Sequence, residues 1–343
     1  MRVRRSHKQD RLAKLYDAEI LPLWSERFGR MLLRGLSLPP KAMVLDVGAG
    51  TGYPALQIVR RMDDASRVVS IDPAGALLDV AREKAGALGG KRIFFRTESA
   101  EPRLSFGDEV FDRVVANLTL SELERPSLAV ADFARVCVPG GSVHATLPLG
   151  GTWVEFLDLL REVLIQEDRP EALVRLDRYQ QRLPSAARLR AWFERAGLVD
   201  VNVATDEFQL VFRSSREFFF APVIEYGPLA EWKEIAGKGD EMQGVFRAVK
   251  EAIDAYFGGS SFAVTVRAGC VSGRKPLEEE RRASLALPVE LDLGAAANGG
   301  EVFLGTGEIE ILADSVISGP PGDDDELLDE EVEEELDVGL KRR

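Results

Sequence analysis

The sequence predicts an α/β fold, with a mostly parallel sheet and helices on both of its faces. Short apolar, β-branched runs alternate with helix-compatible segments from residue 43 onward, as is typical of parallel strands joined by helices. The first run stops in a glycine-rich turn, and the second stops in an acid. Both features occur where the strands of this class end at a ligand. The pattern therefore predicts a binding edge as well as a fold class.

The first strand is expected at Met43–Val47, and the turn after it is built from small residues. These residues are Gly48, Ala49, Gly50 and, after Thr51, Gly52. Because glycine has no Cβ, such a turn brings bare backbone close to a ligand. Asp46, near the end of the strand, then lies at the lip of the pocket. A helix is expected over residues 53–62, and the Lys-Ser/Thr pair of a P-loop does not follow the glycines.

The spacing of the glycines distinguishes two kinds of ligand. In the dinucleotide fingerprint Gly-x-Gly-x-x-Gly, the third glycine comes one position later than here. A pyrophosphate favours a helix N-terminus without a nearby carboxylate, whereas Asp46 favours a ligand with positive charge. The alternative interpretation is an ordinary glycine-rich turn between a strand and a helix, with no ligand.

The second strand is expected over residues 67–71 and ends in Asp72-Pro73. Asp72 is 20 positions beyond Gly52, and an acid at this distance can accept hydrogen bonds from both hydroxyls of a ribose. Asp72 also suits the start of the helix expected over residues 74–88, since Asp before Pro is a good helix start. Both roles are compatible, because the carboxylate lies at one strand terminus.

Three further strands follow in the same alternation. A third strand over residues 92–96 leads into a polar loop, and a fourth over residues 113–117 is followed by a helix over residues 125–136. Pro139-Gly140-Gly141 then turns the chain sharply from helix into a fifth strand over residues 143–147.

Together these motifs, from about residue 40 to 150, resemble the class I, Rossmann-like S-adenosylmethionine-dependent methyltransferases. The turn Asp-x-Gly-x-Gly-x-Gly resembles their first motif, and Phe-Asp-x-Val-Val with a later Arg-Val-x-x-Pro-Gly-Gly resembles the second half of their signature. The similarity is to the ubiquinone/menaquinone-biosynthesis-like group (methyltransferase type 11). It implies a seven-stranded sheet with the sixth and seventh strands near Val199 and Phe262, the seventh antiparallel between the fifth and the sixth.

The resemblance implies S-adenosyl-L-methionine as cofactor and assigns roles to residues. Asp46 and the glycine turn face the positively charged part, and Asp72 with Pro73 holds the ribose. The adenine loop follows the third strand, where Glu98 is the expected acid and a solvated loop glutamate is the open alternative. The full set of expected cofactor-binding residues is Tyr16, Asp46, Gly48, Ala49, Gly50, Gly52, Asp72, Pro73, Glu98, Ser99, Ala100, Asn117 and Leu118.

Two of these residues carry alternatives. Asn117 ends the fourth strand, beside Leu118, and is expected at the cleft floor facing the methyl group. Tyr16 precedes a helix expected over residues 17–33, which lies over the cofactor in similar enzymes. It contacts the methionine moiety in one reading and is a core aromatic in the other.

The acceptor side is expected after the fifth strand. Residues 153–165 have apolar side chains at helical spacing, and residues 171–183 form a second expected helix. By resemblance, this insertion at residues 151–184 covers the substrate cleft. The remaining expected elements are a helix at 186–196 closed by Gly197, strand segments at 200–204 and 209–212, a helix at 214–226 and a strand at 262–267.

The sequence assigns no catalytic base and no metal site. Methyl transfer from a sulfonium depends mainly on proximity and in-line alignment, and of the two histidines His144 lies inside the fifth strand, where a buried role is commoner. Cys137 and Cys270 lie in apolar surroundings, with no metal-ligand cluster. No Asn-Pro-Pro-aromatic motif follows the fourth strand. Its absence disfavours the enzymes that use that motif to methylate amino groups of DNA bases or of protein glutamine. A small or medium-sized metabolite is expected, methylated on O, N or C.

Charge is concentrated at one end of the 343-residue chain. Residues 276–343 contain 20 acidic and 5 basic residues, although the whole chain has a net charge of −13. The nearly neutral remainder disfavours nucleic acid as a partner. The acidic tail is expected to be largely disordered, with alternating apolar residues compatible with a short hairpin around Asn298-Gly299-Gly300. It is also a candidate surface for a protein partner.

The expected organisation is one methyltransferase domain at residues 1–275 and the low-complexity tail at 276–343. The domain divides into a helical cap at 1–40, a cofactor-binding core at 41–150 and the helical insertion at 151–184. No run of about 18 apolar residues and no apolar signal core occur, so a cytoplasmic location without a membrane span is expected. An alternative function is a catalytically weak, methyltransferase-like binding module that acts through the tail.

Overall fold

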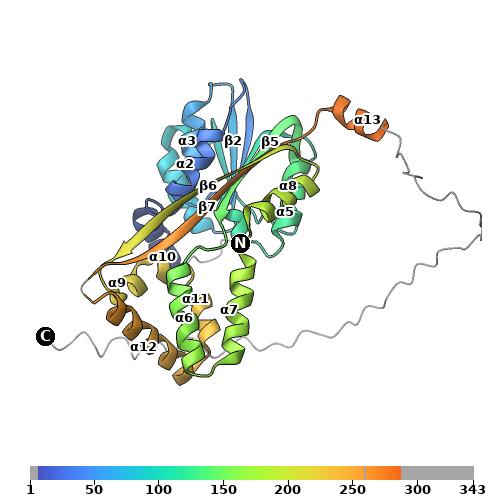
Figure 1. Ribbon diagram of the computed structural model, residues 1–343. Helices are drawn as coiled ribbons and strands as arrows, with labels where there is room; N and C mark the ends of the chain where they lie inside the picture. Colours follow the sequence, from blue (N-terminus) through green and yellow to red (C-terminus); the bar gives the residue numbers. More distant parts are fainter. Residues whose placement is uncertain (1–6, 259, 287–343) are drawn as a thin grey trace, which may run out of the picture. The chain divides into compact units, whose positions relative to one another are not determined.

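The computed structural model describes residues 7–258 and 260–286. They form a seven-stranded sheet in the order β3-β2-β1-β4-β5-β7-β6 (Figure 1). The neighbours from β3 to β5 are parallel, and β7 is antiparallel between β5 and β6, which confirms the expected topology. The strands are β1 (Met43–Val47), β2 (Arg67–Asp72), β3 (Ile93–Thr97), β4 (Phe111–Asn117), β5 (Cys137–Pro148), β6 (Val199–Phe212) and β7 (Phe262–Arg274).

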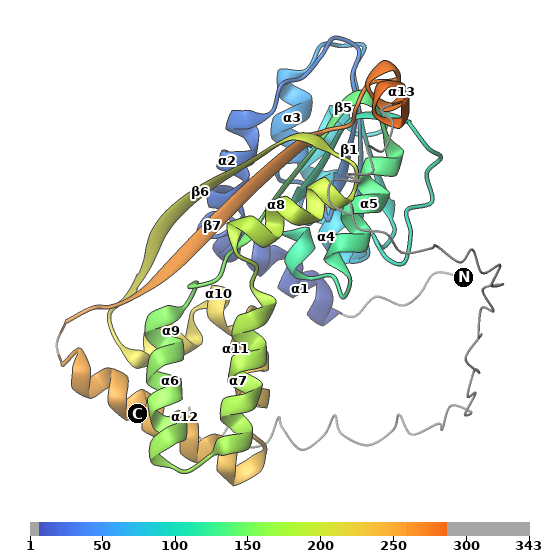
Figure 2. The ribbon, with the colours of Figure 1, turned by 45° about the vertical axis from the view of Figure 1, so that its right-hand side comes forward.

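Helices cover both faces of the sheet, as predicted. On one face lie α2 (Ser25–Gly35) and α3 (Ala55–Arg61), and on the other lie α5 (Pro126–Val136) and α8 (Ala186–Arg195) (Figures 1 and 2). Each face has its own apolar core, centred on residues such as Phe28 in the first and Phe133 in the second. The central strand β1 is buried nearly throughout, which explains its continuous apolar run.

The strands β6 and β7 extend beyond the rest of the sheet as a two-stranded ribbon. The pairing of β7 with β5 ends where Ala268 meets Pro148, whereas its pairing with β6 continues to Phe262 opposite Phe212. The loop after β5 covers the exposed edge of this overhang. Trp153, at the end of that loop, donates its backbone N–H to the Thr265 carbonyl over 2.8 Å, and the carboxylate of Glu155, in the first turn of the following helix, accepts the Thr265 N–H over 2.8 Å.

A helical lobe gathers at the overhanging end of the ribbon, below the sheet in Figures 1 and 2. Its centre is aromatic: Phe156 stacks on Trp232 with ring centroids 4.0 Å apart, and Phe218 packs against both rings. The lobe consists of α6 (Val154–Gln166), α7 (Pro170–Arg182), α9 (Ser215–Phe220), α10 (Pro222–Glu225), α11 (Leu229–Ala236) and α12 (Gly239–Tyr256). The insertion after β5 is thus joined by a second one between β6 and β7.

Several expected elements differ in detail from the structure. The two strand segments at 200–204 and 209–212 are one continuous strand, because β7 pairs along the whole length of β6. The helix expected at 214–226 breaks into α9 and α10 at Pro222, since proline lacks an N–H and holds the residue before it in an extended conformation. Pro139-Gly140-Gly141 forms an irregularity inside β5 instead of a sharp turn before it.

The N-terminal region also differs from the single expected helix at 17–33. It contains α1 (His7–Leu15), a π-helical turn (Tyr16–Ile20) and, after a break at residues 21–24, α2. Trp24 lies at the break and stacks on Trp153 from the other end of the fold, with centroids 5.3 Å apart and planes at 9°. A tertiary contact thus lies where the helix is interrupted, although the helical spacing of the sequence continues through that point.

The start of the expected tail is helical. Helix α13 covers Glu278–Ala286, and Glu280 pairs with Arg274 over 2.7 Å and accepts the Leu277 N–H over 2.7 Å. The first strand of the expected hairpin, over residues 285–293, therefore begins inside this helix. The hairpin around Asn298 and the acidic runs lie outside the described residues. Among the helices that are described, none has the length and apolar character needed to span a membrane.

Candidate active site

The carboxyl ends of β1, β2 and β4 meet at one edge of the sheet. Val47 pairs with Ile71, and Asp46 pairs with Val115 of β4, so the glycine turn, Asp72 and Leu118 converge there. Parallel strands joined by helices place all these ends on the same side. The sequence motifs that lie far apart in the chain are therefore brought together as expected.

Main-chain hydrogen bonds fix the glycine turn. The N–H groups of Gly48 and Ala49 both donate to the Ile71 carbonyl over 2.9 Å. Gly50 donates its N–H to the Asp72 carboxylate over 2.8 Å. These amides are engaged inside the protein, so the turn does not offer them to a pyrophosphate, in agreement with the spacing of its glycines.

The glycines serve different purposes. Gly48 has φ = +73°, and a Cβ built there would lie 2.2 Å from the Thr119 hydroxyl oxygen, which itself donates to the Val47 carbonyl over 2.6 Å. Close packing against Thr119 therefore requires a glycine at position 48. At Gly50, with φ = +52°, the nearest atom to such a Cβ is a ring carbon of Tyr16 at 3.8 Å. Gly50 is thus the glycine that lies under Tyr16.

Asp72 takes the helix-start role expected from the sequence, and its role in holding a ribose stays a prediction. One carboxylate oxygen accepts the Gly50 N–H and the other accepts the Ala74 N–H over 2.8 Å, just before α4 (Gly75–Ala85). Burial raises the pKa of this carboxyl, and the two backbone hydrogen bonds oppose the shift. Each oxygen retains a further lone pair for a ligand hydroxyl.

Asp46 is fully buried instead of lying at the lip of the pocket. Neither of its oxygens accepts a hydrogen bond of normal geometry from the residues that the structure describes. Burial, reinforced by the charge of Asp72, raises its pKa to about 7, and the nearby Ser70 hydroxyl limits the shift. Such an uncompensated buried acid favours a positive charge nearby.

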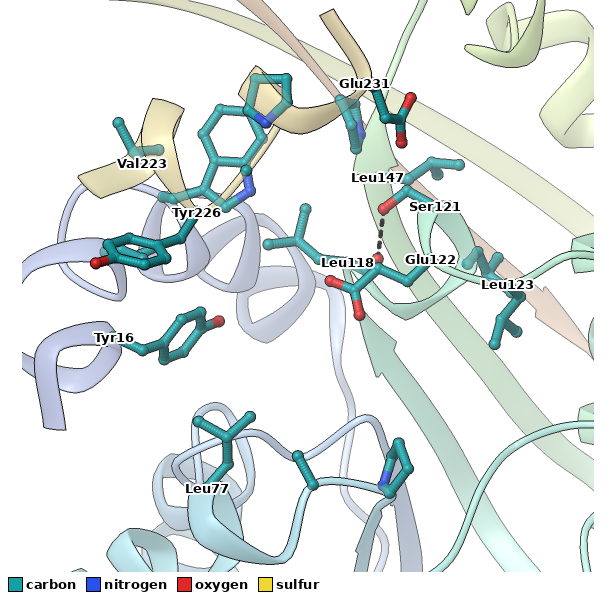
Figure 3. A pocket seen from close by; sticks show the side chains of 18 of the residues that line it. Tyr16, Leu77, Leu118, Ser121, Glu122, Leu123, Leu147, Val223, Tyr226 and Glu231 are labelled. Carbon is teal, nitrogen blue, oxygen red and sulfur yellow. Dashed lines mark hydrogen bonds between the residues drawn. The ribbon is translucent and has the colours of Figure 1, made fainter. Parts of the chain in front are cut away.

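A cavity of about 1700 Å³ opens at this edge of the sheet. Tyr16, Pro73 and Leu118, three of the expected site residues, line it. The lobe forms the opposite side through residues such as Tyr179 and Tyr226. Figure 3 shows Tyr16 and Leu118 on different sides of this open space, with Tyr226 above Tyr16.

Residues 45–145 match the family model described as a methyltransferase domain. This stretch is a methyltransferase domain. The matched stretch runs from β1 into β5 and includes both acids of the binding edge. The resemblance noted in the sequence is thereby confirmed for this part of the chain.

Three relatives of the methyltransferase domain are named for the methylation of different atoms, namely oxygen, nitrogen and carbon. The chain is 35% identical over 168 residues to the malonyl-(acyl-carrier protein) O-methyltransferase of Halorhodospira halophila, which covers 46% of this chain and 54% of that protein. It is 36% identical over 100 residues to the phosphatidylethanolamine N-methyltransferase of Cereibacter sphaeroides (29% and 47%). It is 27% identical over 138 residues to the ubiquinone/menaquinone biosynthesis C-methyltransferase of Geotalea daltonii (39% and 58%). The chain spans about half the length of these relatives.

The residues of the methyltransferase domain fit S-adenosylmethionine, whose sulfonium and amino groups are cationic and whose ribose offers two hydroxyls. Asp46 supplies an unpartnered buried carboxyl behind the turn, which a cationic ligand would favour in its charged form, and Asp72 retains acceptor capacity at the strand end. Tyr16, held by a 2.6 Å hydrogen bond to Ser25, covers the turn from the cavity side. When bound, the cofactor supplies a methyl group on a good leaving group.

The residues expected to contact adenine lie beside the cavity but do not line it. Glu98 accepts the Ser105 N–H over 2.8 Å and pairs with Arg96 at 2.9 Å, and the Ser99 hydroxyl accepts the Glu101 N–H over 3.1 Å. Glu98, Ser99 and the buried Ala100 do not line the cavity, whereas Thr97 does. Their contact with adenine stays a prediction.

Asn117 is held inside the protein instead of lining the cavity. Its amide nitrogen donates to the Ser25 carbonyl over 3.1 Å, and its amide oxygen accepts the Thr146 hydroxyl over 2.7 Å. It therefore ties α2 to β4 and β5. Its expected position facing the methyl group also stays a prediction.

Sequence reasoning missed three features of the site. Thr119, which explains Gly48, lies in the short helical turn after β4 and has no motif of its own. Glu122 points into the cavity from the same turn (Figure 3). The stacked pair Trp24 and Trp153 lines the acceptor side of the cavity, which we call the chamber. In the sequence, each tryptophan shows only the helical spacing of its neighbours, which equally suits a core residue.

The remaining candidates for reactivity are buried and lie away from the cavity. His144 accepts or donates one hydrogen bond with the Ser142 hydroxyl at 2.9 Å, and burial, with the Arg113 charge adding to it, lowers its pKa to about 4. Burial raises the pKa of Cys137 to about 12 and that of Cys270 to about 11. All three act as packed core side chains, as the sequence predicts.

Proposed function

We propose that the protein transfers the methyl group of S-adenosylmethionine to a small or medium-sized acceptor bound in the cavity. The observation that supports this most strongly is the size and position of the cavity. At about 1700 Å³, it exceeds the 300–1,000 Å³ usual for one ligand. It begins at Tyr16 and Pro73 on the binding edge and continues to the lobe. A donor and an acceptor fit side by side.

In this proposal the protein aligns the two reactants and excludes water. Asp72 and Pro73 hold the ribose, Asp46 provides the charge behind the turn, and Tyr16 closes the donor site from above. The aromatic walls of the lobe keep water from the reacting atoms. In-line alignment supplies most of the rate for a donor that already carries a good leaving group.

The domain boundaries follow from the same proposal. The methyltransferase domain comprises residues 1–275, with a cap at 1–40, a core at 41–150 and the insertion at 151–184. The second insertion, from Ser215 to Tyr256, completes the acceptor side. A cytoplasmic location and a protein partner for the tail stay predictions.

The acceptor atom is not fixed by similarity, because the three relatives are named for methylation of O, N and C. The chemistry of the acceptor therefore has to be inferred from the residues that line the cavity. The alternative of a catalytically weak binding module has no support among the described residues.

Titration calorimetry with S-adenosylmethionine and S-adenosylhomocysteine tests the proposal. We expect the native protein to bind both, and Asp72→Asn to bind them about 10- to 100-fold more weakly, because a hydrogen bond to a charged group contributes about 1.5–3 kcal/mol. Asp64→Asn, which changes an exposed acid outside the cavity, is the matched control and keeps native affinity. Absence of binding heat with the native protein would contradict the proposal.

A further inference from the structure

Glu122 projects a carboxylate into the cavity from a rigid turn. Leu118 adopts φ = +69°, the helical turn Thr119–Ser121 follows, and Glu122 donates its N–H to the Thr119 carbonyl over 3.0 Å. The Ser121 hydroxyl donates to the Leu118 carbonyl over 2.6 Å. Figure 3 shows the Glu122 carboxylate and the Tyr16 hydroxyl directed toward the same open centre. The backbone geometry therefore sets where the Glu122 side chain leaves the turn and enters the cavity.

The Glu122 carboxylate has no hydrogen bond or ion pair with any described residue. The arginines that line the cavity are both engaged. Arg182 pairs with Glu231 across α7 and α11, and Arg188 donates to the Gln181 carbonyl over 2.9 Å and lies over the Trp192 ring. Glu122 is thus an uncompensated negative charge inside the chamber, which disfavours an anionic acceptor.

The walls around this carboxylate are aromatic. Tyr16, Trp24, Trp153, Tyr179, Trp192 and Tyr226 all line the cavity. Aromatic faces attract cations, more strongly where water is excluded, and they bind apolar bodies. A cavity that combines such faces with the unpaired Glu122 carboxylate suits an ammonium group carried on an apolar body.

We propose that Glu122 makes the acceptor an amine: it binds the ammonium group of an apolar amine and receives its proton before methyl transfer. This inference rests on the proposed function. The N–H bond breaks and the proton passes to the carboxylate, the freed lone pair on nitrogen forms the new N–C bond, and the electrons of the S–C bond go to sulfur. The carboxyl then returns its proton to water as the methylated ammonium leaves.

The surroundings of Glu122 suit this exchange. Desolvation by the surrounding protein, with the Asp72 charge adding to it, raises the pKa of the Glu122 carboxyl, which makes it a better proton acceptor, although the residue remains exposed to solvent at the cavity. Asp79, the other acid on the donor side of the cavity, already pairs with Arg82 at 2.7 Å. Glu124 lines the same cavity two residues beyond Glu122 and offers a matched control.

Three probes with the same phenyl-alkyl body test the inference: 2-phenylethylamine, 2-phenylethanol and 3-phenylpropanoate. Their affinities are measured near neutral pH by tryptophan fluorescence, with S-adenosylhomocysteine saturating. We expect the native protein to bind the amine about 10- to 100-fold more tightly than the alcohol, and the carboxylate most weakly. In Glu122→Gln the affinity for the amine falls to that for the alcohol, which is unchanged. Glu124→Gln keeps the native preference.

Affinity for the cofactor separates the remaining outcomes. Native protein that binds no S-adenosylhomocysteine contradicts the proposed function. Native protein that binds it but does not prefer the amine, or loses the preference equally in Glu122→Gln and Glu124→Gln, overturns the role of Glu122 alone. If Glu122→Gln weakens S-adenosylmethionine but not S-adenosylhomocysteine and keeps the amine preference, the carboxylate serves the sulfonium and the inference is wrong.

Discussion

The two sides of the cavity are built by different forces. On the donor side the main chain sets the geometry, since Gly48 and Ala49 donate to Ile71 and Gly50 donates to Asp72. On the acceptor side the lining includes packed aromatic side chains, as in the stack of Trp24 on Trp153. Backbone hydrogen bonds have strict geometry, whereas side-chain packing tolerates substitutions of similar volume.

This difference teaches which half of the site can change its ligand. A donor edge tied by main-chain hydrogen bonds admits few substitutions, so it stays specific for one cofactor. A chamber formed by ring contacts can be reshaped by exchanging side chains without disturbing the sheet. The largest effects on stability and donor binding are therefore expected at the edge, and changes confined to acceptor affinity are expected in the chamber.

The largest expected effect is the pH dependence that Asp46 imposes on stability. Because its pKa is about 7 in the folded protein and near 4 when unfolded, the folded state retains a proton that the unfolded state releases. Native stability therefore falls as the pH rises from about 4 to 7, by up to about 4 kcal/mol. In urea unfolding without cofactor, Asp46→Asn gains stability relative to the native protein between pH 5 and pH 8.5.

Asp64→Asn is the control for this titration, because that side chain is fully exposed and has no part in the buried edge. Its unfolding free energy should follow the native curve at both pH values. Parallel curves for the native protein and Asp46→Asn would contradict the burial of an uncompensated acid.

The second effect is steric. In Gly48→Ala the new Cβ would lie 2.2 Å from the Thr119 hydroxyl at a positive φ, so we expect a loss of roughly 3 kcal/mol. Thermal unfolding should begin roughly 6–12 °C lower, with weaker cofactor binding. Gly35→Ala, at a position where no atom lies within 4 Å of the added Cβ, should change the melting temperature little. An unchanged melting temperature for Gly48→Ala would show that Thr119 does not constrain the turn.

The third effect is confined to the chamber. Trp24→Leu removes one ring of the stacked pair, which should weaken binding of 2-phenylethylamine about 3- to 10-fold. Affinity for S-adenosylhomocysteine should stay within about twofold, since the donor edge is held by the main chain. Phe208→Leu, on the ribbon behind Trp24 and outside the cavity lining, should leave both affinities unchanged. A large loss of cofactor affinity in Trp24→Leu would break the distinction between the two sides.

The smallest effect is expected for an ion pair of the lobe. Arg182 and Glu231 are both largely exposed, at 64% and 48% of their side chains, and such pairs contribute less than about 1 kcal/mol. Arg182→Gln should therefore lower the unfolding free energy by less than about 1 kcal/mol in a urea titration. A larger loss would mean that charge, and not apolar packing, joins α7 to α11.

The donor side could largely be predicted from the sequence, because its determinants are local. Asp46, the glycines and Asp72 each lie at a strand end, and the strand register brings them together. The burial of Asp46 was not predictable, since it depends on what packs over the turn. The reason for Gly48 was equally hidden, because Thr119 is 71 residues away in the chain.

The acceptor side could be predicted only in part. Helices α6 and α7 follow from their apolar spacing, but their partners α11 and α12 come from beyond β6 and were not expected. The overhang of β6 and β7 depends on how far each strand pairs, which no local pattern records. Glu122 carries no motif, and its importance appears only when the turn directs it into the cavity.

The most direct test of the account is a crystal structure of the native protein with S-adenosylhomocysteine. We predict that the ribose hydroxyls contact the Asp72 carboxylate, that the nucleoside lies against Pro73, and that the amino-acid portion passes over Gly50 beneath Tyr16. A nucleoside bound anywhere other than the edge formed by β1, β2 and β4 would contradict the account.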